Sequence, residues 1–214
     1  MKGIYLFTWN KSVKIIRYNL EQVSGIDNII ANLIISLWQE YEPWATIDDL
    51  RNNLVNKRGR SIDIAYDLKG DVVGFYIFRV FHYNSWRVMF RGNSFSSKKI
   101  RGVGKPLFDL TLKQFNPDVL ISFTNQERVY KFLSFYGDIL PFPDKKLRDE
   151  EFALLSQIAG KSYVINRDTL IIRDFYKDRH ERQGVYVRDE ITRNFFDVLS
   201  NKDAYALLVR LQHQ

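Results

Sequence analysis

Apolar residues in the first part of the chain recur at two different spacings. From residue 26 to residue 41 they return every three or four positions, which predicts an amphipathic helix that ends before Pro43. Residues 45–57 predict a shorter helix with Thr46 as its N-cap. Alternating or continuous apolar runs predict strands at residues 12–20, 61–68, 72–83 and 86–95. Short turns join the last three strands, which predicts an antiparallel meander.

The spacing of apolar residues changes after residue 100. Residues 104–115 predict a helix that tolerates Pro106 in its first turn, and residues 116–124 predict a short buried strand. Residues 126–137 predict a further helix. A meander followed by helix, strand and helix predicts an α+β fold with one mixed, mostly antiparallel sheet flanked by helices.

The last third of the chain shows no shift in composition that would mark a domain boundary. We expect residues 1–137 to form a core and residues 138–214 to complete or extend the same domain with strands and a helix. In order, the predicted elements are a proline-containing loop at 138–151, a helix at 148–160, strands at 162–176 and 184–189, and a helix at 192–212.

Composition excludes several classes of protein. The chain has 214 residues, of which 45% are hydrophobic and 15% aromatic, as is typical of a globular domain. It has neither the apolar run of about 18 residues that a membrane-spanning helix needs nor the features of a signal peptide at its start. It has no cysteine, which excludes disulfides, thiolate catalysis and cysteine-based metal sites. We therefore expect a cytoplasmic protein without a metal site.

The net charge of +7 is concentrated in one segment. Residues 91–108 contain five basic residues and no acid, so this segment supplies +5 of the total. A local concentration of charge suits a compact anion such as a nucleotide diphosphate, whereas proteins that coat nucleic acid spread their charge over a face. A solvated basic loop is the alternative. The basic residues are Arg91, Lys98, Lys99, Arg101 and Lys105.

A strand, a glycine-containing basic turn and a helix follow one another at this segment, which is a phosphate-binding order of elements. Two common nucleotide motifs are excluded. A Walker A loop needs a glycine where Lys99 stands and a hydroxyl where Pro106 stands. A dinucleotide fingerprint needs a third glycine where Leu107 stands.

The stretch Lys99-Ile100-Arg101-Gly102-Val103-Gly104 resembles the acetyl-coenzyme A loop of the GNAT superfamily of N-acetyltransferases, which reads Arg/Gln-x-x-Gly-x-Gly/Ala. Both glycines match, and Lys99 departs from the pattern. The resemblance covers about residues 12–137. It implies that backbone amides from Arg101 to Lys105 hold the pyrophosphate of acetyl-coenzyme A, the acyl donor. The cofactor-binding residues that it implies are Ser94, Phe95, Ser96, Lys99, Arg101, Gly102, Val103, Gly104, Lys105 and Asn125.

A second motif is similar to the same superfamily. There, an Asn often ends the next strand, and the following helix carries Tyr-x-x-x-Gly-Phe. Here Asn125 ends the strand, and Tyr130 and Phe135 match, while Ser134 replaces the glycine. The resemblance implies that Tyr130 is a general acid for the leaving thiolate, a role that suits a phenol that is neutral at pH 7. An aromatic residue on the apolar face of a helix is the alternative.

The resemblance implies transfer of an acetyl or short acyl group from acyl-coenzyme A to an amine. Because no cysteine can hold an acyl intermediate, direct attack in a ternary complex is expected. The strand at 86–95 contains no acid that could serve as general base. The candidate bases elsewhere are Glu40, Glu42, Glu127 and His82.

Two other classes stay open. One is a nucleic-acid-directed protein, either a binder or an acyltransferase that modifies a base or a tRNA, in which residues 56–60 and 91–108 form one basic patch. The other is a coenzyme A-binding module that has lost catalysis. The sequence identifies neither the amine acceptor nor the oligomeric state.

Overall fold

A computed structural model describes residues 4–9, 12–19, 28–54, 60–98, 100, 102–141, 145–176 and 190–212. The chain folds into two compact units. The first comprises Met1–Phe81 and Phe90–Asn116, and the second comprises His82–Met89 and Pro117–Gln214. The expectation of a core at residues 1–137, completed by residues 138–214, stays a prediction.

In the first unit, neighbouring strands follow one another in chain order. Antiparallel pairing joins the first four strands in sequence. The strands are β1 (Ile4–Trp9), β2 (Val13–Asn19), β3 (Arg60–Tyr66), β4 (Val72–Tyr83) and β5 (Trp86–Ser96). The meander is therefore confirmed, and β1 is an additional strand that the sequence analysis missed. The tip of the β4–β5 hairpin, which belongs to the second unit, turns at Asn84, which has a φ of 51°.

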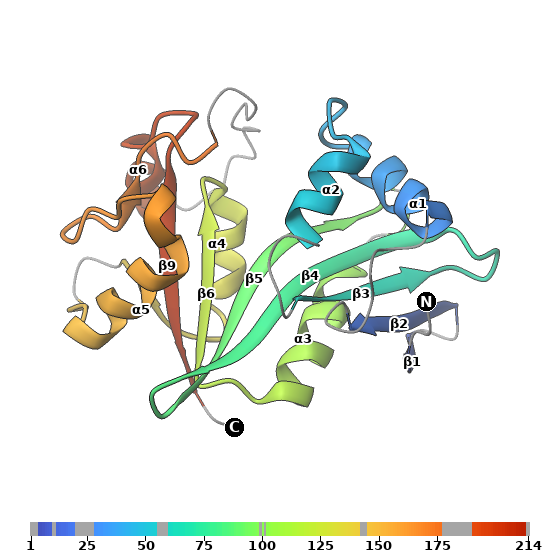
Figure 1. The fold of residues 1–214 in the computed structure, drawn as a ribbon, viewed down its shortest axis with the longest axis horizontal. Helices are drawn as coiled ribbons and strands as arrows, with labels where there is room; N and C mark the ends of the chain where they lie inside the picture. Colours follow the sequence, from blue (N-terminus) through green and yellow to red (C-terminus); the bar gives the residue numbers. More distant parts are fainter. Residues whose placement is uncertain are drawn as a thin grey trace. The chain divides into compact units, whose positions relative to one another are not determined.

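Helices cover both faces of this sheet. Figure 1 shows α1 (Asn28–Gln39) and α2 (Ile47–Leu54) on one face and α3 (Gly104–Phe115) on the other. Side chains alternate along β3, so Ile62 and Ile64 pack in the core with α1 while Asp63 points to the α3 side. All three side chains are fully buried. These strands are thus covered on both faces, and α3 packs on the face to which Asp63 points.

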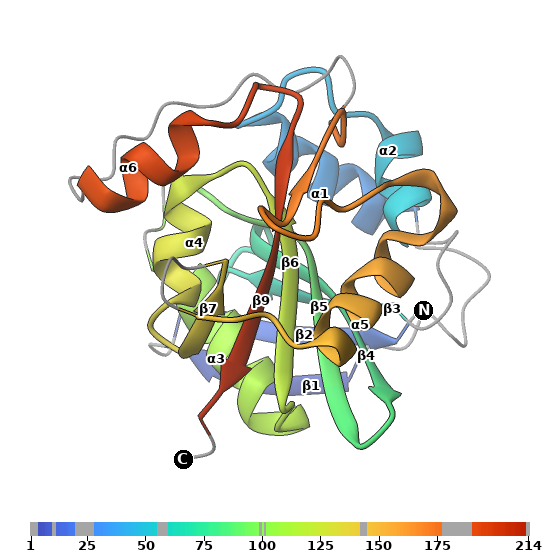
Figure 2. The same cartoon turned by 90° about the vertical axis from the view of Figure 1, so that its left-hand side faces the viewer.

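The second unit is built around antiparallel strands (Figure 2). Strand β9 (Ala204–Leu211) pairs with β6 (Val119–Thr124) on one side and with β7 (Gly137–Leu140) and β8 (Ile171–Ile172) on the other. The unit's α-helices are α4 (Glu127–Leu133), α5 (Asp149–Ala159) and α6 (Glu190–Asp197).

The predicted α+β class, with a mostly antiparallel sheet flanked by helices, is confirmed. Several predicted elements in the last third are wrong. The helix at 192–212 is α6 followed by strand β9, the loop at 138–151 begins with strand β7, and the strand at 162–176 reduces to two residues of β8. The predicted strand at 184–189 lies outside the described residues.

Among the described helices, none has both the length and the apolar character needed to span a membrane. In the same residues, no group of three or more His, Asp or Glu side chains is placed to hold a metal ion.

Candidate functional site

The first turn of α3 presents backbone amides next to the basic segment. Helix α3 begins at Gly104, its cap position Val103 makes no side-chain cap hydrogen bond, and its first turn contains no acid. Gly102, Gly104 and Lys105 are exposed. Because the first amides of a helix lack intrahelical acceptors, this turn can bind an anion. Backbone amides of this kind can donate hydrogen bonds to a pyrophosphate.

The two loop glycines differ in what the backbone demands of them. Gly102 has a φ of +87°, in the left-handed region where side chains cause strain. Gly104 lacks such a constraint, because a Cβ built there would meet only the Ser96 hydroxyl, at 3.9 Å. The conformation of the loop therefore requires glycine at 102 and leaves room for a methyl group at 104.

A third glycine lets the start of α3 approach the sheet closely. A Cβ on Gly74 of β4 would lie 2.9 Å from Val103 Cγ1 and 3.2 Å from Leu107 Cδ1. Val103 and Leu107 are each 1% exposed, so neither has open space to move into. Gly74 thus sets the depth at which the first turn of α3 rests, and the sequence analysis did not identify it as a site residue.

The basic side chains of the segment are partly engaged within the protein. The ammonium of Lys105 pairs with Asp109, one helical turn later. The ammonium of Lys98 lies 2.7 Å from the backbone oxygen of Glu40. Lys99 and Arg101, both predicted to contact the cofactor, lie outside the described residues.

The predicted residues Ser94, Phe95 and Ser96, at the end of β5, each contact other residues of the first unit. The Ser94 hydroxyl accepts a 2.5 Å hydrogen bond from Arg91, and the Ser96 carbonyl accepts one of 2.5 Å from the Tyr41 hydroxyl. The ring of Phe95 lies 5.4 Å from that of Trp38 and 5.5 Å from that of Phe75, measured between centroids. The Phe95 side chain is partly buried and packs against the core.

A buried ion pair holds α3 against β2 and β3. Arg17 Nε and Nη2 donate to the two carboxylate oxygens of Asp63, at 2.6 and 2.5 Å. The Thr111 hydroxyl of α3 donates to Asp63 at 2.8 Å, and the side chain of Gln114 accepts from Arg17. Burial raises the pKa of the Asp63 carboxyl, against the opposing effect of the Arg17 guanidinium. The network fixes the helix whose first turn is the candidate anion site.

Aromatic rings enclose the Arg17 guanidinium. Its central carbon lies 4.9 Å from the centroid of the Phe78 ring and 4.7 Å from that of Phe115. A guanidinium is weakly hydrated and stacks on aromatic faces, so this environment tolerates the buried charge. No sequence pattern indicates this pairing, since β2, β3 and α3 are separated along the chain.

The second unit carries the other two predicted residues, Asn125 and Tyr130. Asn125 is 1% exposed, and its amide donates to the Asn201 carbonyl at 3.2 Å and accepts from Gln126 at 2.9 Å. Tyr130 is 5% exposed, and its hydroxyl lies 3.5 Å from the Pro141 carbonyl. Its ring packs on Phe195 and Phe196 of α6, with centroids 5.5 and 5.7 Å away. Its side chain thus also fills part of the core.

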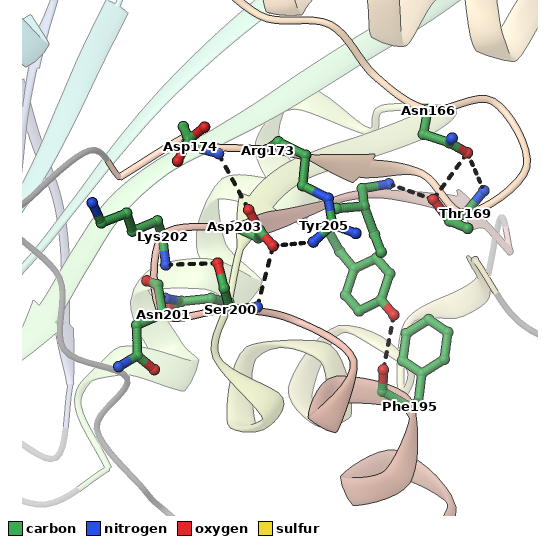
Figure 3. A network of polar contacts seen from close by, with 12 residues as sticks. Asn166, Thr169, Arg173, Asp174, Phe195, Ser200, Asn201, Lys202, Asp203 and Tyr205 are labelled. Carbon is green, nitrogen blue, oxygen red and sulfur yellow. Dashed lines mark hydrogen bonds and ion pairs between the residues drawn. The ribbon is translucent and has the colours of Figure 1, made fainter.

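Asn125 donates its hydrogen bond to the turn at 200–203, and a buried carboxylate holds this turn in place (Figure 3). Asp203, 2% exposed, accepts hydrogen bonds from the backbone amides of Asp174 and Ser200, each at 3.2 Å, and pairs with Arg173. Burial acts to raise the pKa of Asp203, but these hydrogen bonds outweigh it and hold the pKa below its usual value. The turn at 200–203 is thereby fixed around Asn201.

Two of the four candidate general bases, Glu40 and Glu42, take part in structural contacts. Glu42 accepts a 2.7 Å hydrogen bond from the Trp38 indole, and Glu40 accepts one of 3.1 Å from the backbone amide of Lys98. Glu127 begins α4, and His82 is exposed near the tip of the β4–β5 hairpin. The loop residues belong to the first unit, and Asn125 and Tyr130 belong to the second.

No protein-family model matches the chain, and no curated protein matches it. The solved structures that match include several acetyltransferases. Tetrahymena GCN5 matches with 14% identity and a TM-score of 0.47, over 71% of this chain and 89% of that one. A ribosomal-protein-alanine N-acetyltransferase from Brucella melitensis biovar Abortus 2308 matches with 18% identity and a TM-score of 0.45, over 64% of this chain and 98% of that one.

A third match is a GCN5-related glucosamine N-acetyltransferase region in a fungal multi-domain GH3 β-N-acetylglucosaminidase. It has 15% identity and a TM-score of 0.42, over 71% of this chain, but the chain spans only 17% of that protein. Because identities and TM-scores are this low, the three likenesses carry no weight for function.

Proposed function

We propose that the protein transfers an acetyl or other short acyl group from its coenzyme A thioester to an amine. The observation that supports this best is the first turn of α3, which is exposed, lacks an acid and a side-chain cap, and follows a glycine at a φ of +87°. Amides at such a turn bind a diphosphate. Bound acetyl-coenzyme A would supply the activated acyl group.

In this proposal the loop residues 99–105 and the strand end at 94–96 hold the coenzyme, and Asn125 lies along it. Tyr130 keeps a proton on its phenol oxygen at neutral pH and donates it as the thiol leaves. The amine attacks directly, because the chain has no cysteine that could carry the acyl group. The amine attacks as the neutral base, and its nitrogen then loses a proton to water, while the Tyr130 phenolate regains a proton from water. No carboxylate base is needed in this scheme, which fits the structural engagement of Glu40 and Glu42.

The experiment is a calorimetric titration of the protein with acetyl-coenzyme A, followed by mass analysis of a panel of amines incubated with both. We expect micromolar binding, its loss in the double variant Gly102→Glu, Gly104→Glu, and acetylation of at least one amine class. A folded protein that does not bind the coenzyme would refute the proposal.

A coenzyme A-binding module without turnover is the second candidate. The observation that favours it is the burial of Tyr130 among Phe195 and Phe196 together with the bonded state of both Glu40 and Glu42. This candidate predicts the same titration result, but no acetylated product with any amine.

A further inference from the structure

The turn after α1 and the strand end that leads into the glycine loop are joined by a reciprocal pair of hydrogen bonds. The Glu40 carboxylate accepts the backbone amide of Lys98 at 3.1 Å, and the Lys98 ammonium donates to the backbone oxygen of Glu40 at 2.7 Å. The second bond places a cation at the C-terminal end of α1, where the helix dipole favours positive charge. Residues 40 and 98 therefore hold each other by main chain and side chain at once.

Tyr41 adds a second connection between the same two segments. Its hydroxyl donates to the Ser96 carbonyl at 2.5 Å, and the Lys98 ammonium lies 4.8 Å from the centroid of its ring. The ring also packs on Phe95, with centroids 5.5 Å apart. We refer to Glu40, Tyr41, Ser96 and Lys98 as the loop clasp.

The α1 side of the loop clasp is itself well fixed. The Trp38 indole donates to Glu42 at 2.7 Å, and the Gln39 side-chain amide donates to the Ala45 carbonyl at 2.8 Å. Thr46 then caps α2 through reciprocal bonds with Asp49. The turn at 40–46 can thus act as an anchor, whereas the segment after Ser97 leaves the sheet.

We propose that Tyr41 and Lys98 are positioning residues that hold the strand end at 95–98, and with it the glycine loop, in the geometry that binds the coenzyme. The inference rests on the function proposed above. Lys98 acts through the loop clasp and not as a ligand of the phosphates, because its ammonium is directed to Glu40 and Tyr41. Glu40 is an acceptor within the loop clasp and not the general base.

A double-mutant cycle distinguishes this role from a direct phosphate contact. Tyr41→Phe, Lys98→Gln and the double variant are titrated with acetyl-coenzyme A by calorimetry. Each single change removes a connection of the loop clasp, so each is expected to weaken binding about three- to tenfold. Since the two residues act as one unit, the double variant is expected to lose less than the product of the single losses.

Two variants serve as matched controls. Tyr66→Phe removes a tyrosine hydroxyl that lies 3.3 Å from the Tyr18 hydroxyl. Lys113→Gln removes an exposed lysine charge from the last turn of α3. Both are expected to bind the coenzyme as the native protein does. A loss in Lys113→Gln equal to that in Lys98→Gln would assign the effect to net charge and overturn the proposal.

Hydrogen–deuterium exchange of residues 96–105 without ligand supplies a readout that is independent of the coenzyme. Exchange is expected to rise in Tyr41→Phe and Lys98→Gln and to stay unchanged in the two controls. Unchanged exchange, or a silent Tyr41→Phe beside a weakened Lys98→Gln, would overturn the positioning role. If the native protein does not bind acetyl-coenzyme A, the proposed function fails, and the positioning role for the coenzyme fails with it even where exchange rises.

Discussion

Asp63 of β3 and Arg17 of β2 form a pair with two hydrogen bonds beneath α3, at 2.6 and 2.5 Å, and the two side chains are 0% and 5% exposed. The pair also bonds Thr111 and Gln114, so it joins two strands to the helix of the candidate anion site. A buried charge that loses its partner is far more costly than an exposed one.

The first prediction concerns this pair. Asp63→Asn leaves the Arg17 charge buried without a counter-charge, and it should lower the free energy of unfolding by about 3–5 kcal/mol. Urea denaturation measures the loss. Asp48→Asn is the matched control, because the Asp48 side chain is 81% exposed and its ion pair with Arg51 is 3.4 Å long; it should change stability by less than about 1 kcal/mol. Equal effects of the two variants would contradict the structural role assigned to Asp63.

The second prediction tests the close packing of α3 on Gly74 of β4. Gly74→Ala places a methyl group 2.9 Å from Val103 Cγ1, so the first turn of α3 must shift. We expect weaker binding of acetyl-coenzyme A and a lower melting temperature. Val103→Ala removes the clashing carbon, so adding it to Gly74→Ala should cost less than it costs alone. Purely additive effects in calorimetry and thermal unfolding would show that Gly74 does not set the position of α3.

The third prediction separates the two loop glycines. Gly102→Ala forces an alanine to a φ of +87°, which costs about 1–2 kcal/mol and should distort the loop. Gly104→Ala has space for its methyl group and should bind acetyl-coenzyme A with nearly native affinity. Parallel titrations of the two variants provide the comparison, each serving as the control of the other. A larger loss in Gly104→Ala would mean that the ligand itself occupies the space beside Gly104.

The course of β9 shows where sequence patterns stop being informative. Residues 204–209 are all buried, because β9 has strands on both sides and both of its faces are covered. A strand buried on both faces reads as a continuous apolar run, without the alternation that distinguishes a strand from a helix. In β3 and β4, by contrast, turn residues delimit the apolar runs, and both strands were predicted.

The site shows a similar division. The order of strand, glycine loop and helix is local in sequence, and it was predicted correctly at α3. The bond from Tyr41 to Ser96 and the pair of Arg17 with Asp63 join segments that only the fold brings together. No spacing rule connects such residues, so their role in holding the loop and α3 required the structure.

The fourth prediction concerns acid stability. Glu151 is 1% exposed and accepts hydrogen bonds from Arg210 Nε and Nη2 at 2.6 and 2.8 Å and from the Arg148 amide at 2.8 Å. Burial acts to raise the pKa of Glu151, but these bonds outweigh it and hold the pKa below its usual value of 4.5. The unfolded chain therefore binds the proton more readily than the folded one. This stabilisation is complete above the unfolded value and is lost as pH falls through the folded pKa.

In Glu151→Gln, stability at neutral pH should fall by about 1.5–3 kcal/mol. The free energy of unfolding of this variant should also fall less between neutral and acidic pH than that of the native protein. Urea unfolding at a series of pH values measures both. Glu190→Gln, at an exposed position in the first turn of α6, is the matched control and should follow the native profile. A native-like profile for Glu151→Gln would show that the ion pair with Arg210 does not contribute to acid stability.

The fifth prediction concerns Tyr130. In the proposed reaction its phenol donates a proton, and the ring also packs on Phe195 and Phe196. Tyr130→Phe keeps the ring and removes the hydroxyl, which lies 3.5 Å from the Pro141 carbonyl. The variant should therefore fold and bind acetyl-coenzyme A normally, while the acyl-transfer rate falls about 10²–10⁴-fold, as expected for the loss of a general acid.

Tyr205→Phe is a control for loss of a buried hydroxyl, because the Tyr205 hydroxyl donates to the Phe195 carbonyl at 2.8 Å. It should affect stability more than the rate of transfer. Initial rates with saturating acetyl-coenzyme A, measured beside thermal unfolding, separate the two roles. A transfer rate in Tyr130→Phe equal to the native rate would leave Tyr130 as a core aromatic and require a different proton donor.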